Sequence, residues 1–546
     1  MTQNTHDVFN QSPLLENYNM YASDTALSDL IQSHNLQWGQ SQLSKLGAIL
    51  GSTQWIDKGF HVNKFTPEFF SHGARGNRIN EVQYHPAYHD LMKLAFEYQI
   101  PVLPWVSDKK GSHLLRMVLN YLYNQNEAGS ACPLTMTFSS VPVIAKYSGD
   151  EKLLNKILNT NYDPSNQPLS LKTAVTIGMA MTEKQGGTDV QANTSTAVAL
   201  NESATEFELT GHKWFCSAPM CDAFLTLAQT DAGLSCFLMP RWRPNGQLNS
   251  IYIQQLKDKM GNRSNASSEI EFTQAYAQLL GEQGKGVRTI IEMVALTRYD
   301  CMIGSSALMR QAVAQVTHHI SHRKVFNKNL IDQPLMQNVV ADLCLESHAA
   351  LLMTVRIALS LDQQDNDDEQ LLIRLLTAIG KYWICKRAVI VTGEAQECLG
   401  GIGYIEQNIL ARLYREAPVN SIWEGSGNVQ CLDVLRVLKK TPKALAVYFN
   451  ELESVISENI IYKNYVVGLK QELQNATELE YQARYFVEKL ALAMQACQLI
   501  KSKNKLYSES FCQSRLEKNR GLVFGNLPLS IDCKSIINYA KPNLNQ

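Results

Sequence analysis

The sequence predicts a mainly α-helical protein with a central antiparallel β domain and a helical C-terminal extension. Two changes in the spacing of apolar residues carry this prediction. Residues 41–180 have mostly helical spacing, residues 181–284 contain short alternating segments, and helical spacing returns in residues 285–440. Residues 441–546 form a last helical segment with its own charge pattern. Residues 1–40 are polar and irregular, which predicts an N-terminal arm lying on another surface or, alternatively, a disordered tail.

Length and composition are typical of a soluble multidomain protein. With 546 residues, 45% hydrophobic and 18% charged, the chain is too long for a single core. The formal net charge of −1 excludes a polycation, so a nucleic-acid contact would need a local basic patch. Twelve cysteines without a CxxC pair predict free, buried thiols in a reducing cytoplasm. The N-terminus lacks the features of a signal peptide, and Arg356 interrupts the apolar run 349–361, so we expect a cytoplasmic protein without a membrane span.

Three stretches of the N-terminal helical domain have the apolar spacing of core helices. They are residues 43–56, 89–98 and 114–124, and prolines separate them. In the later helical region, the acidic segment 362–369 is most simply a solvated loop between two helices.

The β domain is predicted from short segments that are rich in β-branched and aromatic residues, with glycines or a proline between them. The segments are Ser195–Leu200, Glu206–Leu209, Phe224–Ala228, Cys236–Met239, Ile251–Leu256 and Glu269–Phe272.

The C-terminal segment carries a charge gradient. Residues 442–480 contain three bases and six acids, whereas residues 481–546 contain ten bases and four acids. The bases are densest from Lys501 to Lys505. Such a run is usually a solvated face, and it is a weak signal for nucleic-acid binding.

One stretch combines a carboxylate with glycines and hydrogen-bonding side chains: Ile422, Trp423, Glu424, Gly425, Ser426, Gly427 and Asn428. An apolar surrounding raises a carboxyl pKa, and a glutamate tuned in this way can take a proton from carbon near neutral pH. The glycines allow a close approach to a flat ligand. The alternative is a helix N-cap, in which Ser426 or Asn428 caps the following helix.

Two further motifs offer hydroxyl, amide or aromatic groups to a ligand. The segment 181–190 places consecutive glycines beside hydroxyls, which suits a pyrophosphate or a flavin edge, although a polar loop is the simpler reading. The segment 211–217 follows a strand and puts aromatic surface beside a hydroxyl, as a flavin ring needs, and a buried strand explains it equally well.

Two weaker motifs follow in the C-terminal helical domain. Arg323 could form a charge-assisted bond to phosphate, or it could end a solvated basic helix. The loop 399–404, with Gly400 and Gly401, could admit an adenine or a pyrophosphate. His318 and His322 have the spacing of a zinc pair, but they lack the accompanying carboxylate of a metalloprotease motif, so we expect ordinary helix histidines and no metal.

Taken together, the order and spacing of these motifs resemble the acyl-CoA dehydrogenases, which are FAD enzymes, over residues of about 41–440. The segments 182–187, 258–267 and 414–428 and the C-terminal extension resemble the AidB branch in particular. That branch is the adaptive-response, alkylation-linked group of FAD proteins that bind double-stranded DNA. The resemblance implies the acyl-CoA dehydrogenase fold: a helical N-domain, an antiparallel β domain and a helical C-domain, here with a helical extension.

The resemblance also assigns roles to residues. Glu424 falls at the position of the catalytic base, and Arg323, Phe326 and Gln333 match the group that reaches FAD across a subunit boundary, which implies a homotetramer. The implied cofactor-binding residues are Met181, Thr182, Glu183, Lys184, Gln185, Gly186, Gly187, Thr188, Asp189, Val190, Phe215, Cys216, Ser217, Arg323, Phe326, Gln333, Gly400, Gly401, Ile422, Trp423, Gly425, Ser426, Gly427 and Asn428.

The resemblance implies an FAD protein that binds double-stranded DNA through non-specific phosphate contacts and protects it against alkylation damage. Ordinary relatives have Pro-Gly-Ala at residues 184–186 and glutamine at Glu397, so we expect at most weak acyl-CoA dehydrogenase activity, of the isovaleryl-CoA type. The alternative is a catabolic dehydrogenase of short or branched acyl-CoA without a DNA role. The predicted DNA contacts are Arg436, Lys501, Lys503, Lys505, Arg515, Lys518 and Arg520.

Overall fold

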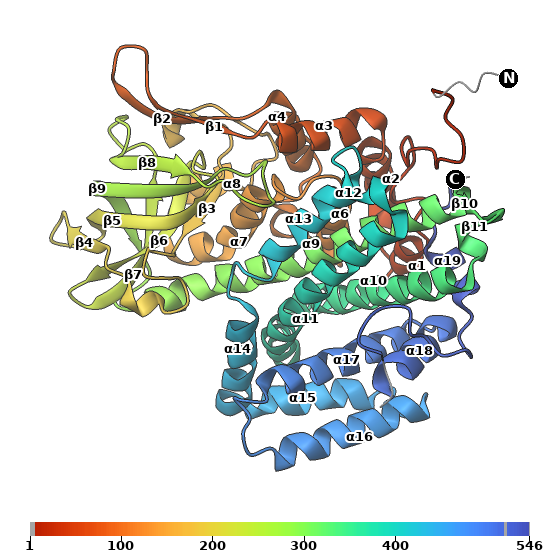
Figure 1. The fold of residues 1–546 in the computed structure, drawn as a ribbon. Helices are drawn as coiled ribbons and strands as arrows, with labels where there is room; N and C mark the ends of the chain where they lie inside the picture. Colours follow the sequence, from red (N-terminus) through yellow and green to blue (C-terminus); the bar gives the residue numbers. More distant parts are fainter. Residues whose placement is uncertain (1–5, 518–520, 545–546) are drawn as a thin grey trace. The chain divides into compact units, whose positions relative to one another are not determined.

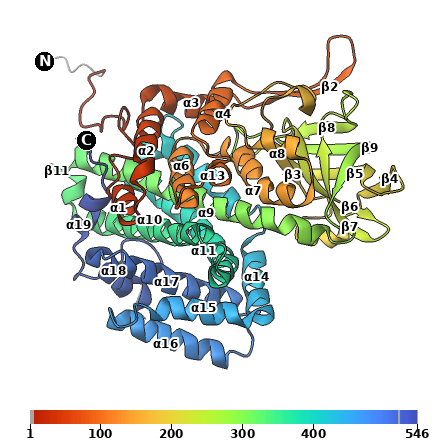
Figure 2. The ribbon, with the colours of Figure 1, turned by 180° about the vertical axis from the view of Figure 1, so that it is seen from behind.

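The computed structural model describes residues 6–517 and 521–544, and the chain divides into two compact units. Unit 1 comprises Met1–Ile56 and Cys301–Gln546, and unit 2 comprises Asp57–Asp300. Figures 1 and 2 show the ribbon from opposite sides. Helices α3 (Thr53–Lys64) and α9 (Gly286–His322) run through the two points in the sequence at which the units meet.

Unit 2 combines helices with a sheet that closes on itself. The described strands follow the order β3-β6-β4-β5-β9-β7, with β8 paired to β9, and a further pairing of β7 with β6 closes the barrel. Most pairs are antiparallel, but β3 and β4 each pair with β6 in parallel. The strands of this sheet are β3 (Ile177–Ala180), β4 (Thr196–Ala199), β5 (Glu206–Ser217), β6 (Ala223–Thr230), β7 (Gly233–Pro240), β8 (Ile251–Leu256) and β9 (Ser267–Leu280).

The helices of unit 2 include two that the apolar spacing predicted, at 89–98 and 114–124. A hairpin of β1 (Glu68–His72) and β2 (Arg78–Gln83) precedes them and contacts β8, so the stretch 41–180, predicted to be mostly helical, also contains a β-hairpin that the prediction did not include. Arg78 fixes the hairpin by donating to the Ile253 carbonyl oxygen at 2.9 Å. The helices are α4 (Pro86–Glu97), α5 (Leu103–Val106), α6 (Ser112–Asn126), α7 (Ala131–Tyr147) and α8 (Glu151–Ile157).

Unit 1 is built on long helices. The predicted helix at 43–56 is divided by a turn at Gly51, and residues 25–33 form a helix rather than an irregular arm. The helices are α1 (Thr25–Ser33), α2 (Gln37–Leu50), α10 (Pro334–Leu361), α11 (Asp367–Leu399), α12 (Gly401–Tyr404), α13 (Ile409–Asn420), α14 (Gly427–Lys440), α15 (Pro442–Glu453), α16 (Ile460–Asn475), α17 (Ala483–Lys501), α18 (Lys505–Phe511) and α19 (Cys533–Ala540). Strands β10 (Lys324–Val325) and β11 (Lys328–Asn329) form a hairpin with a two-residue loop.

Helix α10 is long and apolar enough to cross a membrane by length and composition alone, but 83% of its apolar window is buried inside the protein. It contacts α11, α17 and α19, as a core helix does. Arg356, which interrupts its apolar run, is held by Glu369 in the first turn of α11 and by Glu451 in α15. The predicted acidic loop is therefore shorter than expected, because residues 367–369 already belong to α11.

The helices after residue 440 form a layer on the long helices of unit 1. Both views show α15, α16 and α17 side by side, and α17 contacts α10, α11 and α14 (Figures 1 and 2). The helical extension predicted for residues 441–546 is thus confirmed, and it shares a core with the helices before it. Eleven of the twelve cysteines are buried and all twelve are free thiols, as their spacing predicted.

Candidate functional site

In unit 1, the stretch 422–428 forms a tight turn between α13 and α14. Glu424 has a φ of +58° and Gly425 a φ of +97°, so two consecutive residues occupy the left-handed region. Glycine reaches this region freely, but a glutamate there carries strain. Non-glycine residues of this kind concentrate at functional sites, where surrounding contacts hold them in place.

Two side chains hold this turn by its carbonyl groups. The buried Lys381 of α11 donates from Nζ to the carbonyl oxygens of Trp423 at 2.7 Å and Gly425 at 2.6 Å. Gln430 of α14 donates from Nε2 to the carbonyl oxygens of Glu424 and Gly425, both at 3.0 Å. The backbone on both sides of the carboxylate is therefore fixed by side chains from two helices.

The remaining side chains of the turn differ in burial and in their hydrogen bonds. Ser426 occupies the N-cap position of α14, as the alternative interpretation expected, but its side chain makes no capping bond to the described residues. The indole N–H of Trp423 has no hydrogen-bond partner among the described residues. Asn428 accepts a bond from Arg484 Nε at 2.8 Å, and Ile422 is largely exposed.

Gly427 lies against α11. A Cβ at this position would meet Lys386 Cε at 3.0 Å and the Tyr382 ring at 3.3 Å, so a larger residue here would need these side chains to shift by a few tenths of an ångström. By contrast, Cβ atoms at Gly400 and Gly401 would meet nothing within 4 Å of described atoms, and Gly400 has a φ of +68°. This second glycine pair lies between α11 and α12, in a position that a ligand can approach.

The hairpin of β10 and β11 gathers three further predicted residues. Gln333 donates to the Val325 carbonyl oxygen at 3.2 Å, and the Arg323 carbonyl oxygen accepts from the Leu330 N–H at 2.9 Å. Phe326 lies at the tip, 91% exposed and with a φ of +51°. The Arg323 guanidinium donates to the Asn10 carbonyl oxygen, a contact with the N-terminal segment that the sequence analysis did not anticipate.

The two histidines with zinc spacing have backbone partners. His318 Nε2 lies 2.9 Å from the Pro13 carbonyl oxygen, and His322 Nδ1 lies 2.8 Å from the His318 carbonyl oxygen. Within the described residues, no group of three potential metal ligands is present. His318 therefore helps to attach the N-terminal segment to α9.

In unit 2, the loop 181–190 is anchored by a buried ion pair. Glu183 accepts from Lys213 Nζ at 2.8 Å, and both side chains are fully buried. The same carboxylate accepts from the backbone N–H groups of Thr194 at 2.6 Å and Ser195 at 3.2 Å. Burial alone would raise the pKa of Glu183, but the bonds from Lys213 and Ser195 outweigh it and lower the pKa to about 2. The Glu183 side chain thus shapes the loop and faces the interior.

The rest of this loop faces outward. A Cβ at Gly187 would lie 2.4 Å from Thr182 Oγ1, so only glycine permits this close fold of the loop. The Met181 carbonyl oxygen accepts from Asn193 Nδ2 at 3.0 Å, and Val190 opens a short 3₁₀ turn. The side chains that remain exposed are those of Lys184, Gln185, Thr188 and Asp189, next to the glycine Gly186.

Strand β5 presents an aromatic face at its end. Phe215 is 49% exposed, Cys216 is fully buried and Ser217 is half-buried. Lys257, which the sequence analysis missed, places its Nζ 4.9 Å from the centre of the Phe215 ring and 3.3 Å from that of Trp214. A flat ligand on Phe215 would therefore have a cation beside it, whereas Cys216 can offer only its backbone.

The residues predicted to contact DNA have different environments. Arg436 is 63% exposed and Lys503 is 73% exposed, although Arg436 lies near the buried Asp433 and Lys503 near Glu458. Lys505 is exposed, and Lys501 pairs with Glu451 at 2.8 Å. Lys518 and Arg520 lie outside the described residues.

Arg515 does not fit the role predicted for it. Its guanidinium is 12% exposed and pairs with Asp342 and Glu346, two buried acids of α10. Burial would lower the pKa of Arg515, but these two carboxylates raise it. An arginine held in this way joins the extension to α10 and is withdrawn from a phosphate-binding surface.

Comparison with known proteins agrees with this architecture. The model for the adaptive response protein AidB N-terminal domain matches residues 10–164. The models for the acyl-CoA dehydrogenase middle and C-terminal domains match residues 178–275 and 284–439. The chain is 40% identical to AidB of Escherichia coli (strain K12) over 95% of this chain and 96% of that protein.

Two solved structures share the fold. Caenorhabditis elegans ACDH-11, in complex with C11-CoA, has a TM-score of 0.83 at 24% identity, covering 100% of this chain and 94% of that chain. An acyl-CoA dehydrogenase from Bacillus anthracis, complexed with FAD, has a TM-score of 0.63 at 18% identity, covering 83% and 82%.

The fold and the Trp-Glu-Gly turn define a protein of the acyl-CoA dehydrogenase type, a family whose members bind FAD. The match to AidB over nearly the whole length places it more closely: the chain belongs to the AidB branch of this family. The residues present fit the cofactor in each unit taken by itself. In unit 1 the Gly400–Gly401 loop has open space around it, and in unit 2 the Phe215 ring is 49% exposed and suits contact with a flat ligand.

Proposed function

We propose that this protein is cytoplasmic, binds FAD, carries at most weak acyl-CoA dehydrogenase activity of the isovaleryl-CoA type, and protects double-stranded DNA against alkylation damage. The strained turn at Glu424 is the observation that carries the flavin-dependent part, and the exposed basic side chains of Arg436, Lys503 and Lys505 support the DNA-related part.

In the proposed reaction, Glu424 removes the α-proton of an acyl-CoA thioester. The β-hydrogen leaves as a hydride, for which bound FAD would be the acceptor. Lys381 and Gln430 hold the backbone around the carboxylate, so Glu424 need not be reoriented at the moment of proton transfer. The groups offered to FAD are the Thr182 and Ser217 hydroxyls, the Phe215 ring and the exposed amides of the 181–190 loop.

Replacing Glu424 with glutamine tests the base. Glu424→Gln keeps the shape of the side chain and removes its basicity, so FAD binding should persist while the bleaching of the flavin by isovaleryl-CoA is lost. The measurement is the flavin absorbance during anaerobic titration. Glu406→Gln, an exposed acid before α13, is the matched control and should bleach as the wild type does. Unchanged bleaching in Glu424→Gln would remove this role.

The proposed DNA surface consists of Arg436, Lys503 and Lys505. These side chains are exposed, and each phosphate contact that they make would release bound counterions, so the affinity would fall steeply with salt. Arg515 is excluded from this surface because its side chain is largely buried and pairs with Asp342 inside the protein.

A truncation near residue 440 would be a poor test, because α17 packs on α10 and α11 and its loss would expose their apolar faces. The triple variant Arg436→Gln, Lys503→Gln, Lys505→Gln keeps the fold. It should weaken binding and reduce the slope of log affinity against log salt by about 2–3 in a gel-shift series with duplex DNA. Lys93→Gln, an exposed lysine of α4, is the matched control.

An unchanged slope in the triple variant would contradict this surface. The same series also tests the alternative, a catabolic acyl-CoA dehydrogenase without a DNA role. That alternative is favoured by the number of basic residues in the extension that pair with acids of the same chain: Lys489, Lys501, Lys503 and Arg515. If the wild type shows no salt-dependent DNA binding, the result supports the catabolic dehydrogenase without a DNA role.

We also propose a homotetramer. Phe326 is a large, exposed apolar side chain at the tip of a hairpin, and its backbone lies in the left-handed region, which is costly for a bulky residue. Burial of this tip against a second protomer would account for both features. Phe326→Ser should lower the mass measured by light scattering, and a tetramer that persists in this variant would contradict the assignment.

A further inference from the structure

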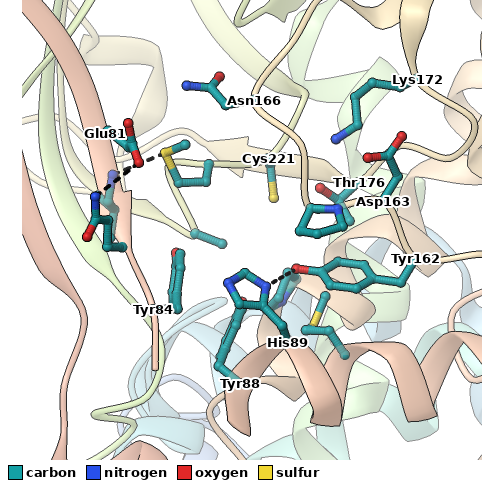
Figure 3. A pocket seen from close by; sticks show the side chains of 17 residues that line it. Glu81, Tyr84, Tyr88, His89, Tyr162, Asp163, Asn166, Lys172, Thr176 and Cys221 are labelled. Atoms are coloured by element: carbon teal, nitrogen blue, oxygen red, sulfur yellow. Dashed lines mark hydrogen bonds between the residues drawn. The ribbon is translucent and has the colours of Figure 1, made fainter. Parts of the chain in front are cut away.

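A cavity of about 360 Å³ lies within unit 2, apart from every residue discussed as a flavin or DNA contact. It is bounded by β2, the start of α4, the segment 162–176 and the residues that follow β5, and 17 described residues line it (Figure 3). Its volume lies at the lower end of the range of about 300–1,000 Å³ typical of small-molecule sites.

One side of this cavity is aromatic. Tyr84 and Tyr88 stack with ring centres 4.1 Å apart, and Tyr162 lies beside His89, with its hydroxyl 3.0 Å from Nδ1 (Figure 3). Burial raises the pKa of all three tyrosines, and it lowers the pKa of His89, so these rings are uncharged near neutral pH. The face of an uncharged aromatic ring is electron-rich and attracts cations.

The charge facing the cavity is negative. Glu81 and Asp163 lie on opposite sides of the cavity in Figure 3. The one lysine among the lining residues, Lys172, is neutralised within the wall by Asp222, with Nζ 2.7 Å from Oδ1 and both side chains buried. A second cation, Arg241, lies behind the wall and donates to the Pro219 carbonyl oxygen at 2.8 Å and to Asn166 Oδ1 at 3.2 Å. Three carboxylates (Glu81, Asp163 and Asp222) and two cations (Lys172 and Arg241) give this group a net charge of −1.

Asp163 attracts charge without needing a hydrogen bond from a ligand. Its Oδ1 already accepts from the Ser165 N–H at 3.0 Å and hydroxyl at 2.5 Å. Its Oδ2 accepts from the Thr173 N–H at 3.1 Å and hydroxyl at 3.4 Å. Burial would raise the pKa of Asp163, but these bonds lower it, so the group stays ionised. A carboxylate whose acceptor sites are filled acts as a fixed negative charge.

From this geometry we infer that the cavity is a binding site for a small quaternary ammonium ligand. Such a cation has no N–H group to donate, so it leaves no hydrogen bond unmade beside a carboxylate whose acceptor sites are filled. Its methyl groups would pack against the tyrosine rings. The site is independent of the proposed flavin and DNA functions, since none of its lining residues serves either of them.

Choline and 3,3-dimethylbutan-1-ol provide the test, because they share one shape and differ in the positive charge. Isothermal titration of the full-length protein should show choline binding at least about fivefold more tightly than the neutral alcohol. Equal affinity for the two compounds, or no binding of choline, would overturn the inference whatever the behaviour of the variants.

Variants locate the site. Tyr84→Leu should weaken choline binding by about tenfold, whereas Tyr84→Phe, which keeps the ring, should bind as the wild type does. Glu81→Gln should weaken it by about threefold. Glu68→Gln removes an exposed acid from the paired strand β1, outside the cavity, and should have no effect. Choline binding that Tyr84→Leu leaves unchanged would contradict this location.

Discussion

Each of the two units holds a predicted ligand-facing segment with a buried lysine, but the lysines work differently. In unit 2, Lys213 pairs with the Glu183 carboxylate, which in turn binds the backbone beyond the loop. In unit 1, Lys381 binds two carbonyl oxygens on either side of Glu424. The lysine pairs with a carboxylate in one case and binds main-chain carbonyl groups in the other.

The difference shows how a protein can use one residue type to stabilise a loop or to preserve reactivity. A lysine bonded to Glu424 would lower its pKa and weaken it as a base. A lysine bonded to the neighbouring carbonyl groups fixes the same turn at a smaller electrostatic cost to the base. The comparison therefore predicts different consequences when each lysine is removed.

The largest expected effect is on stability, from Lys213→Met. It leaves Glu183 buried without its partner, which should cost about 3–5 kcal/mol of unfolding free energy. Denaturant unfolding measures it. The double variant Lys213→Met, Glu183→Leu should recover much of the loss, because no charge then remains buried; a double variant as unstable as the single one would contradict this explanation.

The pH dependence of stability should reveal the same pair. The pKa of Glu183 is lowered from the usual 4.5 to about 2 in the folded protein, so its contribution is complete above pH 4.5 and is lost as pH falls toward 2. Thermal melting of the wild type and of Glu183→Gln should therefore differ at neutral pH and converge over this acid range. A constant difference across the range would argue against the pair.

Lys381→Met should have a smaller effect on stability and a larger one on the turn. Two carbonyl groups lose a donor, which costs about 2 kcal/mol, and the flavin circular dichroism should change because the turn is no longer fixed. Lys443→Met, which changes an exposed lysine of α15, is the control and should leave the spectrum unchanged. An unaltered flavin spectrum in Lys381→Met would show that Gln430 alone holds the turn.

The smallest expected effect is a gain. Glu424→Asn places a residue that tolerates the left-handed region at a φ of +58°, which should stabilise the fold by about 0.5–1 kcal/mol while abolishing proton abstraction. Chemical unfolding alongside the bleaching assay measures both. A loss of stability would mean that Glu424 makes contacts worth more than its backbone strain.

The sequence was sufficient for features set by local pattern. The long helices and six strands of the β domain follow from apolar spacing, and the segment 422–428 forms a turn, as its glycines predicted. It was insufficient where a distant segment decides the outcome: nothing near Lys381 indicates that it will meet a turn 42 residues later. Arg515 and Lys505 are both basic residues of one charged segment, yet only Arg515 meets the buried acids of α10.

The hairpin of β1 and β2 was missed for a similar reason. Its strands are five and six residues long, and they alternate between exposed and less exposed side chains without a continuous apolar face. Contact with β8 and the bonds of Arg78 and Asn80 to Ile253 complete it, and such cross-chain bonds have no local signature in the sequence.

The most direct test of this account is FAD uptake by the purified full-length protein. The account predicts a yellow protein, or a colourless one that takes up FAD when offered it and then shows the absorbance of bound flavin. A protein that stays colourless and leaves added FAD free in solution would contradict both the dehydrogenase chemistry and the role assigned to the Trp-Glu-Gly turn.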